Sequence, residues 1–296
     1  MDAIAKLKNE FAFIKGNILI NTVTLGIILV ITAIPYTYYP KYIEGLGGDP
    51  YIAGVIGFAA YATLALVQIP GGYLADKHGR RSLIITMTFG IAVTYFLFAA
   101  APSWQFLIIA VVLQNMFYIY QPALQAMVAD STPPERRGVS FSIINLLHYI
   151  SVPSPIIAGV LVVHFGLIPG MRIGYIVVGA AFIVAAVIRI KFKETLQNPE
   201  ATPKIKEILR KIPESIVEST KTLKNASKSM RFLFASFAIY HFAWFMCSLN
   251  LIFYATEVLN ITELEWAALM AWFSVVNVLA ALPCGKIVDR FGRKKP

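Results

Sequence analysis

Long stretches without a charged side chain alternate along this chain with short segments rich in lysine and arginine. A helix needs about 20 apolar residues to cross the hydrocarbon core of a bilayer, and a charge at its centre costs about 2.5–3.5 kcal/mol. The pattern therefore predicts an all-α polytopic membrane protein whose chain crosses the bilayer eight times. The predicted crossings occupy residues 16–40, 50–75, the two halves of 82–129, 138–171, 173–188, 232–256 and 266–285.

The third and fourth crossings share one uncharged stretch, and Ala101-Pro102-Ser103 in its middle predicts the turn between them. The sixth crossing is short, and we expect Arg189 to complete it by extending its guanidinium to the membrane interface. We therefore expect no charged side chain deep in a crossing, which disfavours a strongly ionic substrate. The charges at the ends of crossings include Asp76, Asp130, Glu257 and Asp289.

The composition supports a membrane location. Hydrophobic residues make up 57% of the chain and charged residues 14%, against about 45–50% and about 25% in an average globular domain. With the N-terminus inside, all 26 basic residues except Lys41 and Arg172 fall on one side, and short loops rich in Lys and Arg stay in the cytoplasm. This predicts a multi-pass protein of the cell (plasma) membrane with both termini cytoplasmic. It also explains the net charge of +10 without a nucleic-acid partner.

One motif occurs twice and is the strongest signal in the sequence. Residues 70–81 (PGGYLADKHGRR) follow the second predicted crossing, and residues 283–294 (PCGKIVDRFGRK) follow the eighth. We interpret each copy as a cytoplasmic turn that locks one helix pair against another. Its first shared glycine would allow close helix packing, its aspartate would bind a helix N-terminus, and its second shared glycine would adopt positive φ. The residues assigned to this gating signature are Gly72, Asp76, Gly79, Arg80, Arg81, Gly285, Asp289, Gly292 and Arg293.

At these residues the chain resembles the major facilitator superfamily, whose signature loop between helices 2 and 3 has a second copy between helices 8 and 9. Residues 130–138 (DSTPPERRG) resemble the family's loop between helices 4 and 5, and residues 193–195 (KET) resemble its signature after helix 6. The resemblance implies two six-helix bundles and a midplane site between them that opens alternately to each side. It also implies that Asp76 contacts helix 11 and that Asp289 contacts the start of helix 5.

The resemblance divides the chain into three parts. Residues 1–190 form an N-terminal six-helix transmembrane bundle, residues 191–230 a cytoplasmic linker, and residues 231–296 the incomplete start of a second bundle. The family continues for four more helices, so we expect a truncated product, with helices supplied by another polypeptide as the alternative. Apolar residues recur at helical spacing in the linker, which fits either an amphipathic helix on the inner leaflet or a solvated tether.

Polar residues on the helices that line the family's cavity are candidate substrate contacts. Helices 1, 4, 7 and 10 have this role in the family, and the first three are present here. Polar side chains inside a membrane bundle meet a partner, water or a ligand, so interhelical hydrogen bonding is the alternative interpretation. Helix 4 carries the cleanest stripe. The candidates are Asn21, Thr24 and Tyr36 in helix 1, Gln114, Tyr118, Gln121 and Gln125 in helix 4, and His241, Trp244 and Asn250 in helix 7.

These observations predict a secondary active transporter of a small neutral or amphipathic solute. Residues 151–159 (SVPSPIIAG) loosely resemble an element of the superfamily's exporters, and their small residues would let helix 5 pack against helix 8. We therefore favour efflux over uptake of a sugar or other metabolite. A coupling proton would need His148 or His241 as its carrier, and hydrogen-bonded packing is the alternative role for both. No motif of an enzyme, cofactor site or metal site occurs, and a non-transporting membrane protein or sensor is the alternative class.

Overall fold

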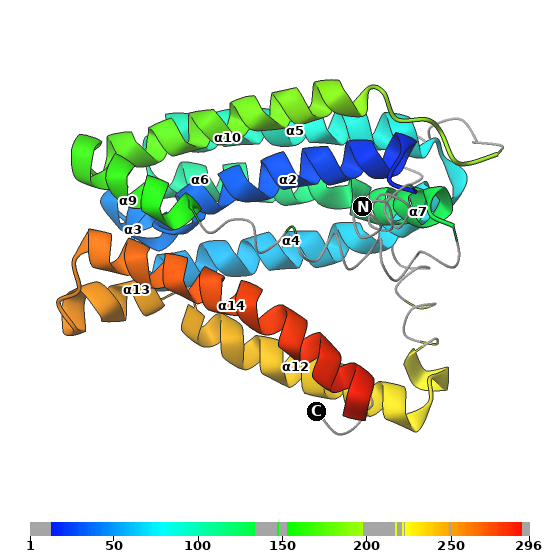
Figure 1. Cartoon of the computed structure of the whole chain (residues 1–296). Coiled ribbons are helices and arrows are strands. Elements are labelled where there is room, and N and C mark those ends of the chain that lie inside the picture. Colours follow the sequence, from blue (N-terminus) through cyan, green and yellow to red (C-terminus); the bar gives the residue numbers. More distant parts are fainter. Residues whose placement is uncertain are drawn as a thin grey trace, which may run out of the picture.

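The computed structural model describes residues 13–133, 147, 153–197, 217, 221, 223–248 and 250–291, with only the backbone at Ile69, Val278 and 281–291. Every regular element in these ranges is a helix, which confirms the predicted all-α class (Figure 1). The helices are α2 (Gly16–Tyr36), α3 (Tyr39–Gly45), α4 (Pro50–Lys77), α5 (Arg80–Ala100), α6 (Trp104–Phe117), the 3₁₀-helix η1 (Tyr118–Tyr120), α7 (Gln121–Ser131), α9 (Ser154–Phe165), α10 (Leu167–Arg189), α12 (Lys228–Ser248), α13 (Leu251–Phe253), the π-helix η3 (Tyr254–Val258) and α14 (Glu263–Phe291).

Six helical stretches in the described part of the chain are long and apolar enough to cross a membrane. They are α2, α4, α5, the continuous run α6–η1–α7, α10 and α12. The short apolar helix α9 belongs to the fifth predicted crossing, whose earlier part lies mostly outside the described residues. The eighth predicted crossing lies within α14.

The first predicted turn lies where the sequence placed it, because α5 ends at Ala100 and α6 begins at Trp104. The start of α4 is also readable from the sequence. The Asp49 side chain accepts a hydrogen bond of 2.7 Å from the N–H of Ile52, and Pro50 occupies the first turn of the helix, where its missing N–H costs nothing.

The turn between α9 and α10 lies earlier than predicted. Gly166 ends α9 with φ of +83°, a conformation that favours glycine, and α10 then runs for 23 residues. Arg172 therefore lies inside α10 instead of in a loop. Its charge is accommodated because its Nη2 donates to the Ala101 carbonyl at 3.0 Å, just beyond the end of α5.

The helices α2, α5, α6, α7 and α10 pack around a core that is rich in aromatic rings at one end. The ring of Tyr175 lies 5.3 Å from that of Tyr42 and 5.2 Å from that of Phe98, between centroids. Gly179 permits the close approach of α10 to α5, since a Cβ there would lie 2.9 Å from the Phe96 ring. These contacts make α10 and α5 a tightly packed pair.

We distinguish two ends of the bundle. The basic end holds the start of α2, the α4–α5 turn, the end of α7 and the end of α10; the far end holds α3, the α5–α6 and α9–α10 turns and the start of α14. In Figure 1, α13 and the start of α14 lie beside α3 and α9 at the far end, and α12 and α14 diverge from α4 toward the basic end. Gly159 of α9 makes close packing with α14 possible, because a Cβ there would lie 2.8 Å from Ala267 Cβ.

Candidate functional site

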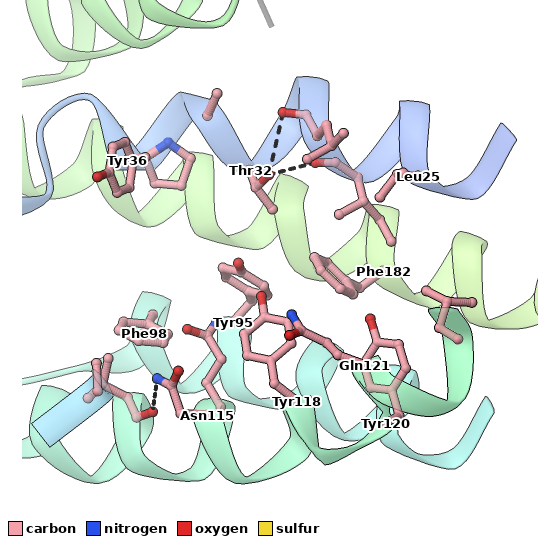
Figure 2. A pocket seen from close by; sticks show the side chains of 18 of the residues that line it. Leu25, Thr32, Tyr36, Tyr95, Phe98, Asn115, Tyr118, Tyr120, Gln121 and Phe182 are labelled. Carbon is pink, nitrogen blue, oxygen red and sulfur yellow. Dashed lines mark hydrogen bonds between the residues drawn. The ribbon is translucent and has the colours of Figure 1, made fainter. Parts of the chain in front are cut away.

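A cavity of about 1080 Å³ lies inside the bundle, between α2, α4, α10 and the run α6–η1–α7. Figure 2 shows labelled side chains from α2, α5, α6, η1, α7 and α10 around it. Its wall is mostly aromatic and aliphatic, with a few amides and hydroxyls. The aromatic residues are Tyr36, Tyr39, Tyr61, Tyr95, Phe98, Tyr118, Tyr120, Tyr175, Phe182 and Phe245. An apolar cavity with a few polar groups is the usual form of a small-molecule site.

Six of the predicted substrate contacts line this cavity. The four residues of the helix 4 stripe all do, although that helix is not continuous α-helix. From helix 1, Asn21 and Tyr36 reach the wall, whereas Thr24 is fully buried behind it. The six residues are Asn21, Tyr36, Gln114, Tyr118, Gln121 and Gln125.

Helix 4 is broken by η1 in the middle of the cavity wall. Pro122 lies in the first turn of α7, and a proline inside a helix lacks the N–H donor and clashes with the carbonyl four residues earlier. The chain accordingly tightens into a 3₁₀ turn over Tyr118–Tyr120. Figure 2 shows Tyr118, Tyr120 and Gln121 extending from this segment into the cavity. The break thus presents three adjacent polar side chains to one space.

Two amide groups on the wall keep hydrogen-bonding capacity that the described residues do not use. Asn21 is 2% exposed, and its Oδ1 has no hydrogen-bond partner in the described part of the chain. The Gln114 side chain interacts with the Tyr95 hydroxyl. Gln68 Nε2 donates to Gln121 Oε1 at 2.7 Å, which leaves the amide nitrogen of Gln121 as a donor. A buried polar atom without a partner costs about 1–3 kcal/mol, so these atoms favour a polar occupant.

Arg189 corrects the expectation that no charge lies deep in a crossing. Its side chain is fully buried at the edge of the cavity, with Nε donating to Thr24 Oγ1 at 3.2 Å and Nη1 to Thr88 Oγ1 at 2.8 Å. Each threonine lies eight residues inside the basic end of its helix, or about 12 Å at 1.5 Å per residue. The guanidinium therefore extends into the bundle instead of out to the interface.

The direction of the Arg189 side chain follows from the direction of α10. Side chains on a helix lean toward its N-terminus. Arg189 is the last residue of α10, whose N-terminus lies at the far end, so the side chain leans toward the middle of the bundle. Snorkelling to the basic end would require the opposite lean. A linear pattern does not reveal this lean, so the sequence does not place Arg189 among the cavity residues. It does place Arg189 at the end of the sixth crossing, where α10 ends.

The predicted contacts on helix 7 lie away from the cavity. His241 is exposed on α12, where its Nδ1 lies 2.9 Å from the Phe237 carbonyl oxygen, and Trp244 is 48% exposed. Asn250 lies beside α4, where it lines a small separate hollow. Instead Phe245 reaches the main cavity from α12, with its ring centroid 4.5 Å from that of Tyr61. The other proton-carrier candidate, His148, lies outside the described residues.

At the basic end, the three segments that resembled family signatures meet at one arginine. Arg80 is buried and forms an ion pair with Asp130, while its Nη1 donates to Thr195 Oγ1 at 3.1 Å and its Nε to the Ala75 carbonyl at 2.7 Å. The α4–α5 turn, the end of α7 and the segment after α10 are thereby joined.

Glu194 adds a second tie at the same end. Its Oε2 accepts from the backbone N–H of Arg81 at 2.9 Å, at the start of α5, and its Oε1 accepts from the N–H groups of Thr195 and Leu196. Burial alone would raise the pKa of the carboxyl, but the backbone hydrogen bonds outweigh it and lower the pKa. The carboxylate thus binds the positive end of α5 in its ionised form.

Two glycines of the signature do not have the predicted roles. Gly79 has φ of −54°, so it is the N-cap of α5 and not a residue in the left-handed region. A Cβ on Gly72 would meet nothing within 4 Å, whereas one on Gly71 would clash with the Ile119 carbonyl oxygen of η1. Close packing therefore depends on Gly71. Asp76 is exposed in the last turn of α4.

The second copy of the signature is described in part. The backbone of α14 continues through Gly285 and Asp289 to Phe291, while Gly292 and Arg293 lie outside the described residues. The residues 139–141 expected to meet Asp289 also lie outside them.

At the far end, polar contacts join the first six helices to the segment after α12. Lys41 Nζ lies 2.8 Å from Glu257 Oε1 and 3.1 Å from Glu44 Oε2. Desolvation opposes the charge on Lys41, but the hydrogen bonds to both glutamates raise its pKa overall. Tyr38 Oη donates to the Glu263 carbonyl oxygen, and Trp266 Nε1 donates to the Thr37 carbonyl at 3.4 Å.

A bundle of membrane-length helices around a partly polar cavity, closed by contacts at one end, defines a multi-pass membrane protein of the transporter class. Residues 18–296 match the Major Facilitator Superfamily. The chain belongs to this family.

Curated relatives include efflux proteins at low identity. The multi-drug resistance efflux pump PmrA of Streptococcus pneumoniae is 28% identical over 166 residues, which cover 54% of this chain and 41% of the pump. The multidrug resistance protein MdtG of Salmonella arizonae is 26% identical over 272 residues, covering 87% of this chain and 63% of that protein. The chain thus matches between about two fifths and about three fifths of the length of these relatives.

A solved structure shows the same fold. A bacterial homolog of the human lysosomal transporter Spinster, in an inward-facing and unoccupied conformation, aligns with a TM-score of 0.66 at 16% identity. The alignment covers 93% of this chain and 62% of that one. At this identity the likeness establishes the arrangement of the helices.

Proposed function

We propose that this chain serves a secondary active transporter that exports a small amphipathic solute by alternating access. The observation that carries the proposal is the cavity of about 1080 Å³, whose walls combine aromatic rings with a few amide and hydroxyl groups. Such a wall suits a solute with an apolar body and a polar group. The six cavity-lining candidates named above are the proposed substrate contacts.

The distribution of contacts supports an inward-facing state. In the part of the chain that the structure describes, the polar contacts between the segments before and after the linker, through Lys41, Tyr38 and Thr37, lie at the far end. The basic end carries the Lys- and Arg-rich loops, and such loops stay in the cytoplasm. We therefore place the basic end in the cytoplasm and the closed end outside.

Export is favoured by two observations. The relatives PmrA and MdtG carry names of multidrug efflux and resistance proteins. In addition, α9 packs on α14 through Gly159, as the small residues of the exporter-like segment suggested. We propose a proton as the coupling ion. His241 lies on α12 away from the cavity, so the proton would need another carrier. The second histidine considered for this role, His148, lies outside the described residues.

The test is dye transport by the 296-residue chain in proteoliposomes, with neutral, cationic and anionic amphipathic dyes and an imposed pH gradient. The proposal expects gradient-dependent export of at least one dye. Ala60 lies on the cavity wall, so Ala60→Trp would fill the cavity and should abolish export. Leu19 is 48% exposed on α2, so Leu19→Trp should leave export intact. Import under every gradient would indicate uptake. No flux, or equal flux in both variants, would contradict transport through this cavity and favour a non-transporting protein.

A further inference from the structure

Arg189 has a hydrogen-bond arrangement that spreads its charge without neutralising it. It donates to the hydroxyls of Thr24 and Thr88, which in turn donate to the backbone carbonyls of Asn21, at 3.2 Å, and Ile84, at 2.6 Å. Each chain from the guanidinium therefore ends on a neutral carbonyl oxygen. No carboxylate in the described part of the chain forms an ion pair with it.

The third hydroxyl connects this charge to the cavity. Arg189 Nη1 lies 3.3 Å from Tyr120 Oη, and the guanidinium carbon lies 5.6 Å from the centroid of the Tyr120 ring. Because the phenol oxygen accepts this hydrogen bond, its own hydrogen is left to donate. Figure 2 shows Tyr120 among the side chains that face the cavity, where it is 5% exposed while Arg189 is fully covered. A ligand would therefore meet the Tyr120 hydroxyl first, with the arginine behind it.

A further donor lines the same wall. The amide nitrogen of Gln121 is left over from the bond to Gln68. The phenol and this amide are both donors, and a buried positive charge lies behind the phenol, so this part of the wall suits an oxyanion better than a cation. The Oδ1 of Asn21 is an acceptor elsewhere on the wall and does not oppose an anion held at Tyr120. The rings of Phe98, Phe182 and their neighbours supply an apolar wall for the remainder of the ligand.

We propose that the cavity selects amphipathic organic anions, with the oxyanion bound by the Tyr120 hydroxyl and stabilised by Arg189, and the apolar body packed on the aromatic wall. This inference rests on the proposed function and specifies its substrate class. It replaces the expectation of a neutral solute, which depended on the absence of a deep charge. Tyr120 is the proposed ligand contact and Arg189 a positioning residue that acts through it.

The test compares two probes that share one apolar body. Anilinonaphthalene sulfonate is anionic, and N-phenyl-1-naphthylamine has the same rings without the sulfonate. Binding is measured by fluorescence on the 296-residue chain in nanodiscs of zwitterionic lipid, with empty nanodiscs subtracted. The wild type should bind the anion more tightly. A charge-assisted hydrogen bond corresponds to about 10- to 100-fold in affinity, so Arg189→Gln should weaken anion binding by about that factor and change binding of the neutral probe less than twofold.

Two further variants separate ligand binding from structural support. Tyr120→Phe removes the hydroxyl and keeps the ring, so it should reproduce the selective loss even where Arg189→Gln fails to fold. Arg189→Lys keeps the charge and should restore part of the preference for the anion. Equal loss for both probes would mean that Arg189 only supports the fold, and an unchanged anion preference in Tyr120→Phe would also overturn the proposal.

Transport distinguishes this inference from the proposed function. If the chain exports the neutral probe but neither binds nor exports the anion preferentially, the transporter proposal stands and the anion proposal fails. If it exports neither probe but binds the anion through Tyr120, the site is real and the transport proposal fails.

Discussion

Lys41 Nζ lies 2.8 Å from Glu257 Oε1, which joins the short helix α3 to the π-helix η3 at the far end of the molecule. The side chain of Lys41 is only 12% exposed, while that of Glu257 is 54% exposed. The same ammonium group also contacts Glu44 within α3. The ammonium group of Lys41 thus pairs with Glu44 on its own helix and with Glu257, which follows α12.

Replacing Lys41 should weaken the far-end closure more than replacing either glutamate. Lys41→Met removes both ion pairs, whereas Glu257→Gln leaves the Lys41–Glu44 pair in place. Since Glu257 is half exposed, the coupling between Lys41 and Glu257 should be about 1 kcal/mol or less. A double-mutant cycle on the thermal unfolding of the purified protein measures it, with Glu44→Gln as the control. Additive effects of Lys41→Met and Glu257→Gln would show that the contact contributes nothing.

Glu194→Gln should make stability less dependent on acidic pH. The folded-state pKa of Glu194 is lowered, so its contribution is present above the unfolded pKa of about 4.3 and is lost as pH falls toward the lower folded value. Near pH 7 the wild type should be more stable than the variant by about 1 kcal/mol, because Gln would place N–H groups near those of Arg81 and Thr195.

Thermal unfolding of both proteins between pH 3 and 7 provides the measurement. The difference between wild type and Glu194→Gln should shrink as the pH drops below about 4. A difference that stays constant over the whole range would mean that the charge of Glu194 has no part in holding the start of α5.

Neighbouring glycines on α4 should respond in opposite ways to the same substitution. Gly71→Ala places a Cβ against the Ile119 carbonyl and should destabilise the protein by about 1–3 kcal/mol, whereas Gly72→Ala meets nothing. The second change should be neutral or stabilise by up to about 1 kcal/mol, since alanine lowers the backbone entropy of the unfolded chain. Unfolding midpoints in detergent compare the two. Equal midpoints would contradict the close contact between α4 and η1.

The proposed orientation predicts which loops an impermeant maleimide reaches. In a background with Cys247→Ser and Cys284→Ser, Glu44→Cys should be labelled in intact cells. Lys77→Cys, at the basic end, should be labelled only after permeabilisation. Both positions are exposed, so access and not burial decides the result. Labelling of Lys77→Cys in intact cells would reverse the orientation.

The helices could be predicted from the sequence because uncharged length sets a membrane crossing, and the Ala101-Pro102-Ser103 turn lay where Pro and Ser interrupt the run. The α9–α10 turn could not be predicted in the same way. The charge of Arg172 predicts a loop, but its guanidinium donates to the Ala101 carbonyl while the residue stays inside a helix. The free carbonyls near the end of a neighbouring helix that make this possible are not visible in a linear pattern.

The helix 4 stripe was accessible to sequence reasoning because residues spaced three and four apart share a helix face. The sequence does not show that Gly71 and not Gly72 contacts a neighbouring helix, because this depends on the rotation of α4 against η1. Likewise, α12 turns Phe245 toward the cavity and leaves His241 and Trp244 outside it. Helical spacing on that segment gave no single polar face that could have fixed its rotation.

The hydrogen bonds of Arg189 have a mechanical consequence. One side chain on α10 is fastened to α2 through Thr24 and to α5 through Thr88, well inside the membrane. Sliding any of these three helices by a single turn would break these hydrogen bonds and leave a buried guanidinium without them. We therefore expect α2, α5 and α10 to move as one rigid unit in any change of conformation.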